Sequence, residues 1–196
     1  MAIELRAKAA NGAARVAKQV VPKSAPLEEP AGVAIGLNAA ILTVRNNEPN
    51  VLVVRQDGGE GDGLPFGIFA PLDHRTLDIG LRQCVAEQTG LQLGYVEQLY
   101  TFGEVKRDPR ERVVSVAYYA LTKPEDHTTA ASTDAAEAKW FPIGGVPSLA
   151  FDHATILEAA LQRLRGKLAY QPIGFELLPP KFTLTQLQRL YEAVLD

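Results

Sequence analysis

Cysteine, tryptophan and histidine are scarce in this chain of 196 residues, which contains one cysteine, one tryptophan and three histidines. The lone cysteine, Cys84, cannot form a disulfide within the chain, which fits a protein of the reducing cytoplasm. His74 and His127 have no partners at metal-ligand spacing. No apolar run is long enough to cross a membrane, and no signal-peptide pattern opens the sequence. The sequence therefore predicts neither a disulfide scaffold nor a membrane-spanning protein.

A strong charge of one sign is also lacking, because 20 basic and 23 acidic side chains leave a net charge of −3. Such a balance gives no overall signal for binding nucleic acid. A hydrophobic content of 46% in 196 residues is enough to bury one good core, with a small appendage. We therefore expect a cytoplasmic protein with one main globular domain.

The first 32 residues differ from the rest in composition. Residues 2–21 are rich in alanine with interspersed lysine and arginine, a pattern typical of a marginal amphipathic helix. Residues 22–32 contain three prolines and indicate a linker. Such an arm could contact a phosphate backbone or act as a targeting presequence. Terminal extensions are more often solvated or packed on a partner subunit, and this is the interpretation we favour.

The remaining sequence predicts strands followed by helices. Runs of β-branched and aromatic residues indicate strands, and apolar residues three and four positions apart indicate helices. Thr76, Asp152 and Thr183 are expected to cap the helices. The first two strands are expected to form a hairpin with its turn at residues 46–50. The expected strands cover residues 33–44, 51–56, 64–71, 95–102, 112–121 and 138–143, and the expected helices cover 77–89, 153–165 and the residues after 183.

Three side chains share one face of the expected helix over residues 77–89. Cys84, Glu87 and Gln88 are spaced i, i+3 and i+4, so they lie on neighbouring turns. The surrounding segment resembles the Nudix signature G-x5-E-x7-R-E-U-x-E-E-x-G-U, in which U is aliphatic. Counted back from its final glycine, the signature falls on Phe69, Arg75, Gln83, Cys84, Val85, Glu87, Gln88, Gly90 and Leu91. Only Val85, Glu87, Gly90 and Leu91 agree with it.

The substitutions remove most of the metal chemistry that the signature implies. Three carboxylates on this face could hold Mg²⁺ against a diphosphate. A thiol is a poor ligand for a hard cation, and a neutral amide brings no charge, so Glu87 is the one remaining metal candidate. Arg75 and Gln83 replace the residues that would support the carboxylates. We expect a binding site without efficient hydrolysis, and we interpret Cys84 as a small buried hydrophobic side chain.

A polar loop over residues 103–111 joins two expected strands and carries a high density of charge. Arg107 and Arg110 could clamp a pyrophosphate through bidentate guanidinium contacts. Aromatic side chains nearby could stack on adenine. The alternative is a solvated hairpin tip whose neighbouring aromatic residues belong to the core. The residues predicted to contact a ligand are Arg55, Phe69, Phe102, Arg107, Arg110 and Tyr118.

Segments outside the signature resemble the NrtR-type, Nudix-related regulators of NAD metabolism more closely than the signature itself does. The resemblance covers roughly residues 33–196 and is carried by residues 97–103, 107–110, 113–121, 139–142, 149–153, 172–179 and 182–188. It implies an α/β fold, the Nudix α/β/α sandwich with a mixed sheet. It further implies a domain that senses ADP-ribose or a related NAD-derived nucleotide, requires no cofactor, and controls transcription of NAD biosynthesis and salvage genes.

The C-terminal residues 171–196 resemble the start of a winged-helix domain, which places the Nudix-like domain at residues 33–170. Thr183 is followed by apolar residues at helical spacing, ending at Val194 and Leu195. A helix-turn-helix reader needs a further helix to enter the major groove. We therefore expect DNA binding only through an incomplete or missing C-terminal domain. The apolar face of this helix is expected to seek a partner, most simply in a homodimer.

Two other functions remain open from the sequence. A working nucleoside-diphosphate hydrolase, similar to an ADP-ribose pyrophosphatase, would need Mg²⁺ and replacement acids such as Asp73, Asp78 or Glu104. A scaffold that binds no nucleotide would use the fold only for dimerisation. Because a buried cap and a structural histidine are the simpler interpretation of Asp152 and His153, we do not expect them to be a catalytic pair.

Overall fold

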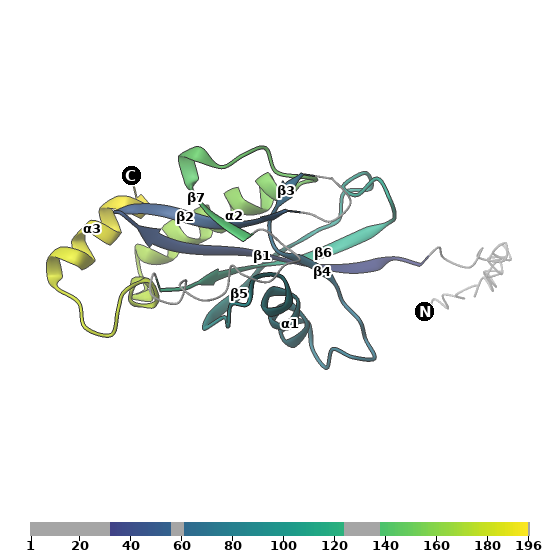
Figure 1. The fold of residues 1–196 in the computed structure, drawn as a ribbon, viewed down its shortest axis with the longest axis horizontal. Helices are drawn as coiled ribbons and strands as arrows, with labels where there is room; N and C mark the ends of the chain where they lie inside the picture. Colours follow the sequence, from purple (N-terminus) through teal and green to yellow (C-terminus); the bar gives the residue numbers. More distant parts are fainter. Residues whose placement is uncertain (1–31, 56–60, 124–137, 196) are drawn as a thin grey trace, which may run out of the picture. The chain divides into compact units, whose positions relative to one another are not determined.

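The described part of the chain, residues 32–55, 61–123 and 138–195 of this computed structural model, contains seven strands in one mixed sheet. Its central order is β3-β2-β1-β6-β5, with β4 paired to β1 and β7 paired to β2 (Figure 1). β1 and β6 are parallel, and the other pairs are antiparallel. The strands are β1 (Ala34–Arg45), β2 (Glu48–Arg55), β3 (Asp62–Gly63), β4 (Phe66–Ile68), β5 (Tyr95–Phe102), β6 (Val113–Leu121) and β7 (Ala138–Pro142). The basic arm expected at the N-terminus lies outside the described residues, apart from Gly32.

The β1–β2 hairpin has a tighter turn than expected. Asn46 and Asn47 alone separate the strands, with φ angles of 53° and 61°. Two consecutive left-handed residues match the twist of a two-residue hairpin, and asparagine tolerates this conformation better than most side chains. The expected turn over residues 46–50 was therefore too long, since Glu48, Pro49 and Asn50 already belong to β2.

Helix α1 (Leu77–Thr89) has the limits that its sequence predicts. The Thr76 hydroxyl accepts a hydrogen bond from Ile79 N at 3.2 Å, and Gly90 ends the helix in the left-handed conformation. Leu81 and Val85 are buried, which confirms the predicted apolar stripe. Gly80 packs closely on His74, because a Cβ atom at this glycine would lie 2.7 Å from His74 Nδ1.

Helices cover both faces of the sheet, which confirms the predicted α/β/α sandwich (Figure 1). Leu81 and Val85 of α1 pack with one face, and Ile156 and Leu164 of α2 (His153–Leu168) pack with the other. α2 extends three residues beyond the expected end at position 165. Side chains alternate across the central strands, as expected for a sheet buried on both faces. The described residues contain no helix long and apolar enough to span a membrane.

The C-terminal helix α3 (Leu184–Leu195) begins with a reciprocal cap. Gln186 N donates to the Thr183 hydroxyl at 3.2 Å, and Thr183 N donates to Gln186 Oε1 at 2.7 Å. Leu190 and Val194 are buried against the α2 side of the core, together with η3 (Ile173–Leu177). The apolar face of α3 is therefore covered mainly by residues of the same chain. The expectation that this face is exposed and needs a partner was wrong, and the homodimer stays a prediction.

Candidate functional site

Gln88 is the best-anchored of the three side chains at the metal positions of α1. Phe66 N of β4 donates to Gln88 Oε1 at 3.1 Å, and Gln88 Nε2 donates to Phe66 O. The amide therefore satisfies both polar groups of one residue of β4. A carboxylate could accept from the Phe66 N–H but could not donate to the carbonyl oxygen. Gln88 thus holds α1 against β4 in a way that glutamate cannot.

Cys84 also faces β4. It is partly buried, and a Cβ atom added at Gly67 would lie only 2.3 Å from Cys84 Sγ. Burial raises the pKa of the Cys84 thiol, and the charge of Glu87 raises it further. A protonated thiol packed on a glycine agrees with the predicted role as a small hydrophobic side chain.

The residues present on α1 do not fit a magnesium site. Glu87, Gln83 and Arg75 are exposed, and Gln88 is engaged with the β4 backbone. In the parts of the chain that the structure describes, no three His, Cys, Asp or Glu side chains lie close enough together to hold a metal ion. Asp78, one of the acids considered as a replacement, is paired with Arg82 at 2.9 Å. A single exposed carboxylate lacks the ligand set that Mg²⁺ requires.

A Gln88→Glu variant tests the structural role of the amide. We expect a loss of about 1–3 kcal/mol in unfolding free energy, because the Phe66 carbonyl would face a carboxylate that cannot donate to it. Gln83→Glu makes the same change at an exposed position of α1 and should stay within about 0.5 kcal/mol of wild type. Urea unfolding of both variants at pH 7 gives the comparison, and equal losses would contradict the assigned role.

Arg107 is buried rather than directed at a ligand. Its side chain is 3% exposed, and its Nε and Nη2 atoms donate to Asp152 Oδ2 and Oδ1 at 2.8 and 2.5 Å. Arg107 was predicted to clamp a pyrophosphate, and the carboxylate of Asp152 now occupies that guanidinium fork. Asp152 was predicted to cap α2, but its side chain makes no capping hydrogen bond. Both predictions were wrong for the same reason, because the Arg107 guanidinium and the Asp152 carboxylate bind each other.

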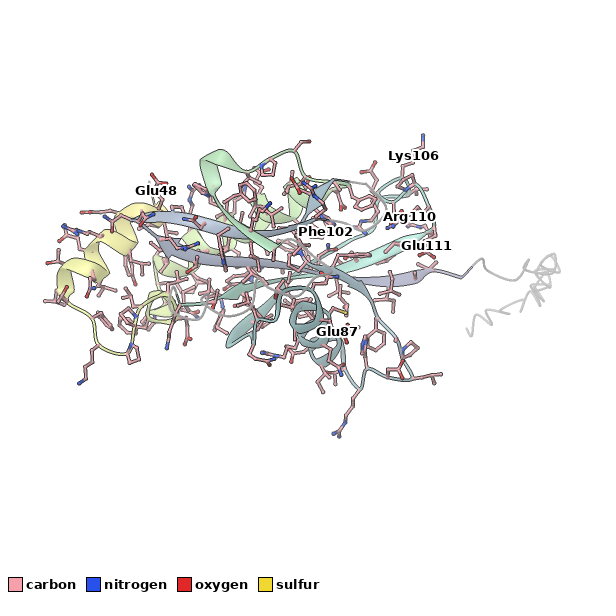
Figure 2. All side chains as sticks on the ribbon, in the orientation of Figure 1. Glu48, Glu87, Phe102, Lys106, Arg110 and Glu111 are labelled. Atoms are coloured by element: carbon pink, nitrogen blue, oxygen red, sulfur yellow. The ribbon has the colours of Figure 1, made fainter. Side chains whose placement is uncertain are left out.

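Arg110 is the more accessible arginine of the loop. Its guanidinium forms two hydrogen bonds with Asp108, at 3.0 and 2.8 Å, and lies 5.1 Å from the centre of the Phe151 ring. The hydrogen bonds from Arg110 lower the pKa of Asp108. The Arg110 side chain is nevertheless half-exposed, and Figure 2 shows it at the same end of the strands as Lys106 and Glu111. Glu87 lies apart from this group, on α1 (Figure 2).

His153 lies below this loop in a buried polar network. Leu64 N donates to His153 Nδ1 at 3.1 Å, so the neutral ring carries its proton on Nε2. Nε2 lies 2.9 Å from the side-chain amide of Asn38, whose other end contacts Ser115. The Nε2 proton of His153 has an acceptor when the Asn38 side-chain oxygen faces it. The Asn38 NH₂ group then donates to the Ser115 hydroxyl. Burial lowers the pKa of His153 to about 4, so the ring is a neutral structural group.

Phe151 completes the site and is held in a strained conformation. Its φ angle of 54° is unusual for a bulky residue, and such strain is concentrated at functional positions. The Phe151 ring centre lies 5.5 Å from that of the His153 ring, and the Phe66 ring centre lies 6.3 Å from it. Sequence reasoning did not select Phe151 or Phe66 for ligand contact. The signal available was the 149–153 segment, which carried part of the family resemblance.

The remaining predicted contacts do not converge on one point. Arg55 pairs with Asp62 at 3.8 Å, and Asp62 O accepts a hydrogen bond from Ala150 N at 2.8 Å, so Arg55 lies near the segment that precedes α2. Phe69 and Tyr118 pack on the α1 side of the sheet, whereas Phe102 packs on the α2 side. The loop arginines contact Asp152 and Phe151, and Arg55 reaches the same segment through Asp62.

Within the described residues, the loop and the segment before α2 bring together a guanidinium and an aromatic ring, which can contact an anionic ligand that carries a planar group. Asp108 holds the Nε and Nη2 atoms of Arg110, as Asp152 holds those of Arg107, but the Arg110 side chain is half-exposed, so its guanidinium can still contact a phosphate beside the Phe151 ring. The buried histidine is hydrogen-bonded within the core and is not presented to solvent. We call residues 103–112 with residues 149–152 the loop site.

Comparisons with known proteins agree with this architecture. Residues 174–196 match the NrtR DNA-binding winged helix domain family. The chain is 30% identical over 164 residues to the ADPR responsive transcriptional repressor NtrR of Acinetobacter baylyi, with 81% of this chain and 65% of that protein covered. The chain thus spans slightly less than two thirds of that relative.

Two solved structures extend the similarity to the fold. The crystal structure of Shewanella oneidensis NrtR has a TM-score of 0.75 and 30% sequence identity, covering 83% of this chain and 78% of that one. The NUDIX domain of Shewanella oneidensis NrtR complexed with ADP ribose has a TM-score of 0.58 and 29% identity, covering 68% and 90%. Membership of one family explains the sandwich fold, the altered signature and the C-terminal match together. The chain belongs to the NrtR family.

Proposed function

We propose that this chain is the nucleotide-sensing part of a transcription regulator of NAD biosynthesis and salvage genes. It binds ADP-ribose or a related NAD-derived nucleotide at the loop site without efficient hydrolysis and without a required cofactor. Its relative from Acinetobacter is described as an ADPR responsive repressor, and a Shewanella relative was crystallised with ADP ribose. The observation that carries the proposal is the engagement of Gln88 with β4 at a metal position of an otherwise Nudix-like helix.

The proposal includes the partners and the organisation of the chain. DNA would be bound through the winged-helix domain that begins at about residue 171, in a cytoplasmic homodimer. Residues 33–170 would form the ligand-binding domain. A ligand can control DNA binding only if it binds two conformations unequally. The buried pair between Arg107 and Asp152 ties the loop site to the start of α2, and Arg165 of α2 donates to Val194 O of α3 at 2.9 Å. α2 therefore offers a physical connection between the two parts.

Isothermal titration with ADP-ribose, with and without Mg²⁺, tests the function. We expect micromolar binding that does not require Mg²⁺, with the nucleotide intact when the mixture is separated by chromatography. Arg110→Ala should weaken binding by about tenfold or more, because a charge-assisted contact is lost. Arg45→Ala, an exposed arginine at the far end of β1, is the control. Release of AMP and ribose phosphate at a Mg²⁺-dependent rate would instead establish the hydrolase.

A further inference from the structure

One face of α2 forms a groove with β5 that the loop site does not use. Residues 159, 162, 163, 166 and 167 recur at the three- and four-residue spacing of a single helical face, and Tyr170 lies in the turn that follows α2. With Tyr100 of β5 they line an open groove of about 320 Å³. We call this space the α2 groove.

The floor of the α2 groove contains two cations, Arg163 and Lys167, that share the carboxylate of Glu97. Arg163 Nη1 donates to Glu97 Oε1 at 3.1 Å, and Lys167 Nζ donates to Glu97 Oε2. Burial alone would raise the pKa of Glu97, but hydrogen bonds from Lys167, Tyr95 and Tyr119 outweigh it and lower the pKa. One ionised carboxylate therefore faces two cations. Glu158, the nearest other acid on this helix, contacts Gln162 at 3.3 Å.

Two tyrosine side chains on the walls are accessible to a ligand. Tyr100 is 55% exposed and Tyr170 is 70% exposed, and both line the groove. The Arg163 guanidinium lies 5.4 Å from the centre of the Tyr100 ring. Exposed aromatic rings beside a guanidinium offer a stacking surface and an anion contact within one small volume.

Gly166 keeps the middle of the groove open. A Cβ atom at this position would meet nothing within 4 Å. The glycine is therefore not required by close packing, and it costs helix stability relative to alanine. Gly166 lies in the last turn of α2, and because a Cβ there meets open space, a large side chain at this position would project into the groove.

We propose that the α2 groove binds a mononucleotide, with its phosphate at Arg163 and Lys167 and its base on an exposed tyrosine ring. Lys167 Nζ donates to Tyr95 OH at 3.4 Å as well as to Glu97, which leaves one of its three N–H groups for a phosphate. Arg163 is hydrogen-bonded to Glu97 and Tyr100, and its five N–H groups exceed these two contacts. This site is separate from the loop site and does not depend on the proposed response to ADP-ribose.

Titration of the full chain with AMP, adenosine and inorganic phosphate tests the proposal. We expect AMP to bind at least tenfold more tightly than adenosine, because the cationic floor contacts the phosphate. Inorganic phosphate should bind at least tenfold more weakly than AMP, because it has no base to stack. Equal binding of AMP and either fragment would overturn the proposal, as would no binding of AMP at millimolar concentration.

Three glycine variants locate the site. Gly166→Phe should fill the groove and weaken AMP binding at least tenfold, whereas Gly166→Ala should leave the affinity within twofold. Gly144→Phe is the matched control, because an added Cβ there also meets nothing within 4 Å. Equal AMP affinities for the two phenylalanine variants would contradict the assignment to the groove.

The two sites fail independently. Arg110→Ala should weaken ADP-ribose binding and leave AMP binding to the groove unchanged. Gly166→Phe should do the reverse. Loss of AMP binding in Arg110→Ala with no effect of Gly166→Phe would assign both nucleotides to the loop site and overturn the inference.

Discussion

An Arg107→Ala variant is expected to lose about 3–5 kcal/mol of unfolding free energy. The substitution leaves the Asp152 carboxylate, which is 20% exposed, without the two hydrogen bonds that hold it. It also removes a side chain that is buried between the loop and the start of α2. Because these contacts fix the loop to the helix, the variant should also bind ADP-ribose more weakly, although the Arg107 guanidinium is already engaged by Asp152.

Urea unfolding at pH 7 measures the effect, with Lys106→Ala as the control. Lys106 is exposed on the same loop, so its loss should change stability by no more than about 0.5 kcal/mol. A cycle with Asp152→Ala isolates the pair. We expect the double variant to be much less destabilised than the sum of the single variants, because neither charge is then left alone. Additive losses would show that the two side chains are not coupled.

Acidification from pH 7 is expected to destabilise the protein through His153. The pKa of this group falls from 6.5 to about 4 on folding, so between these values the unfolded chain binds the proton more readily. The stabilisation is complete above pH 6.5 and is lost progressively as the pH falls towards 4. The expected loss is about 2 kcal/mol by pH 5 and about 3 kcal/mol by pH 4.

The carboxylates lose their contributions to stability at lower pH than His153 does, so the contribution of His153 can be measured separately. The pKa values of Glu97 and Asp108 are lowered on folding, so their contributions persist above the ordinary carboxyl values of 4.5 and 3.8 and are lost only as the pH falls below them. Unfolding free energies at pH 7, 6 and 5 therefore report mainly on His153. A His153→Gln variant should lose this slope, and the same change at His74 should retain it. An unchanged slope in His153→Gln would show that another group titrates.

Local sequence patterns predicted most of the elements. The limits of α1 follow from Thr76, whose hydroxyl accepts from the Ile79 amide in the first turn, and from Gly90, which ends the last turn. Strands β5 and β6 follow from their β-branched and aromatic residues. These features depend on neighbours within a few positions, so one sequence is enough to recognise them.

Side-chain partners distant in sequence could not be predicted. Asp152 has the residue type and position of a helix cap. Its carboxylate instead binds Arg107, which lies 45 positions earlier in the sequence. A bidentate, largely buried guanidinium is a stronger partner than a backbone amide. Similarly, the apolar spacing of α3 correctly predicted a helix, but the spacing does not say that η3 and α2 cover it. The role of Gln88 was missed for the same reason, because its partner is the backbone of a strand 22 residues away.

The amide at position 88 has a consequence for the fidelity of a cellular signal. A receptor that grips a diphosphate through bridging metal ions reports the product of two concentrations, since its occupancy follows free magnesium as well as nucleotide. In this chain Gln88, at one of the positions that would hold the ion, is hydrogen-bonded instead to the backbone N–H and C=O of Phe66. Under the proposed function, occupancy would follow the concentration of the nucleotide and would not depend on free magnesium.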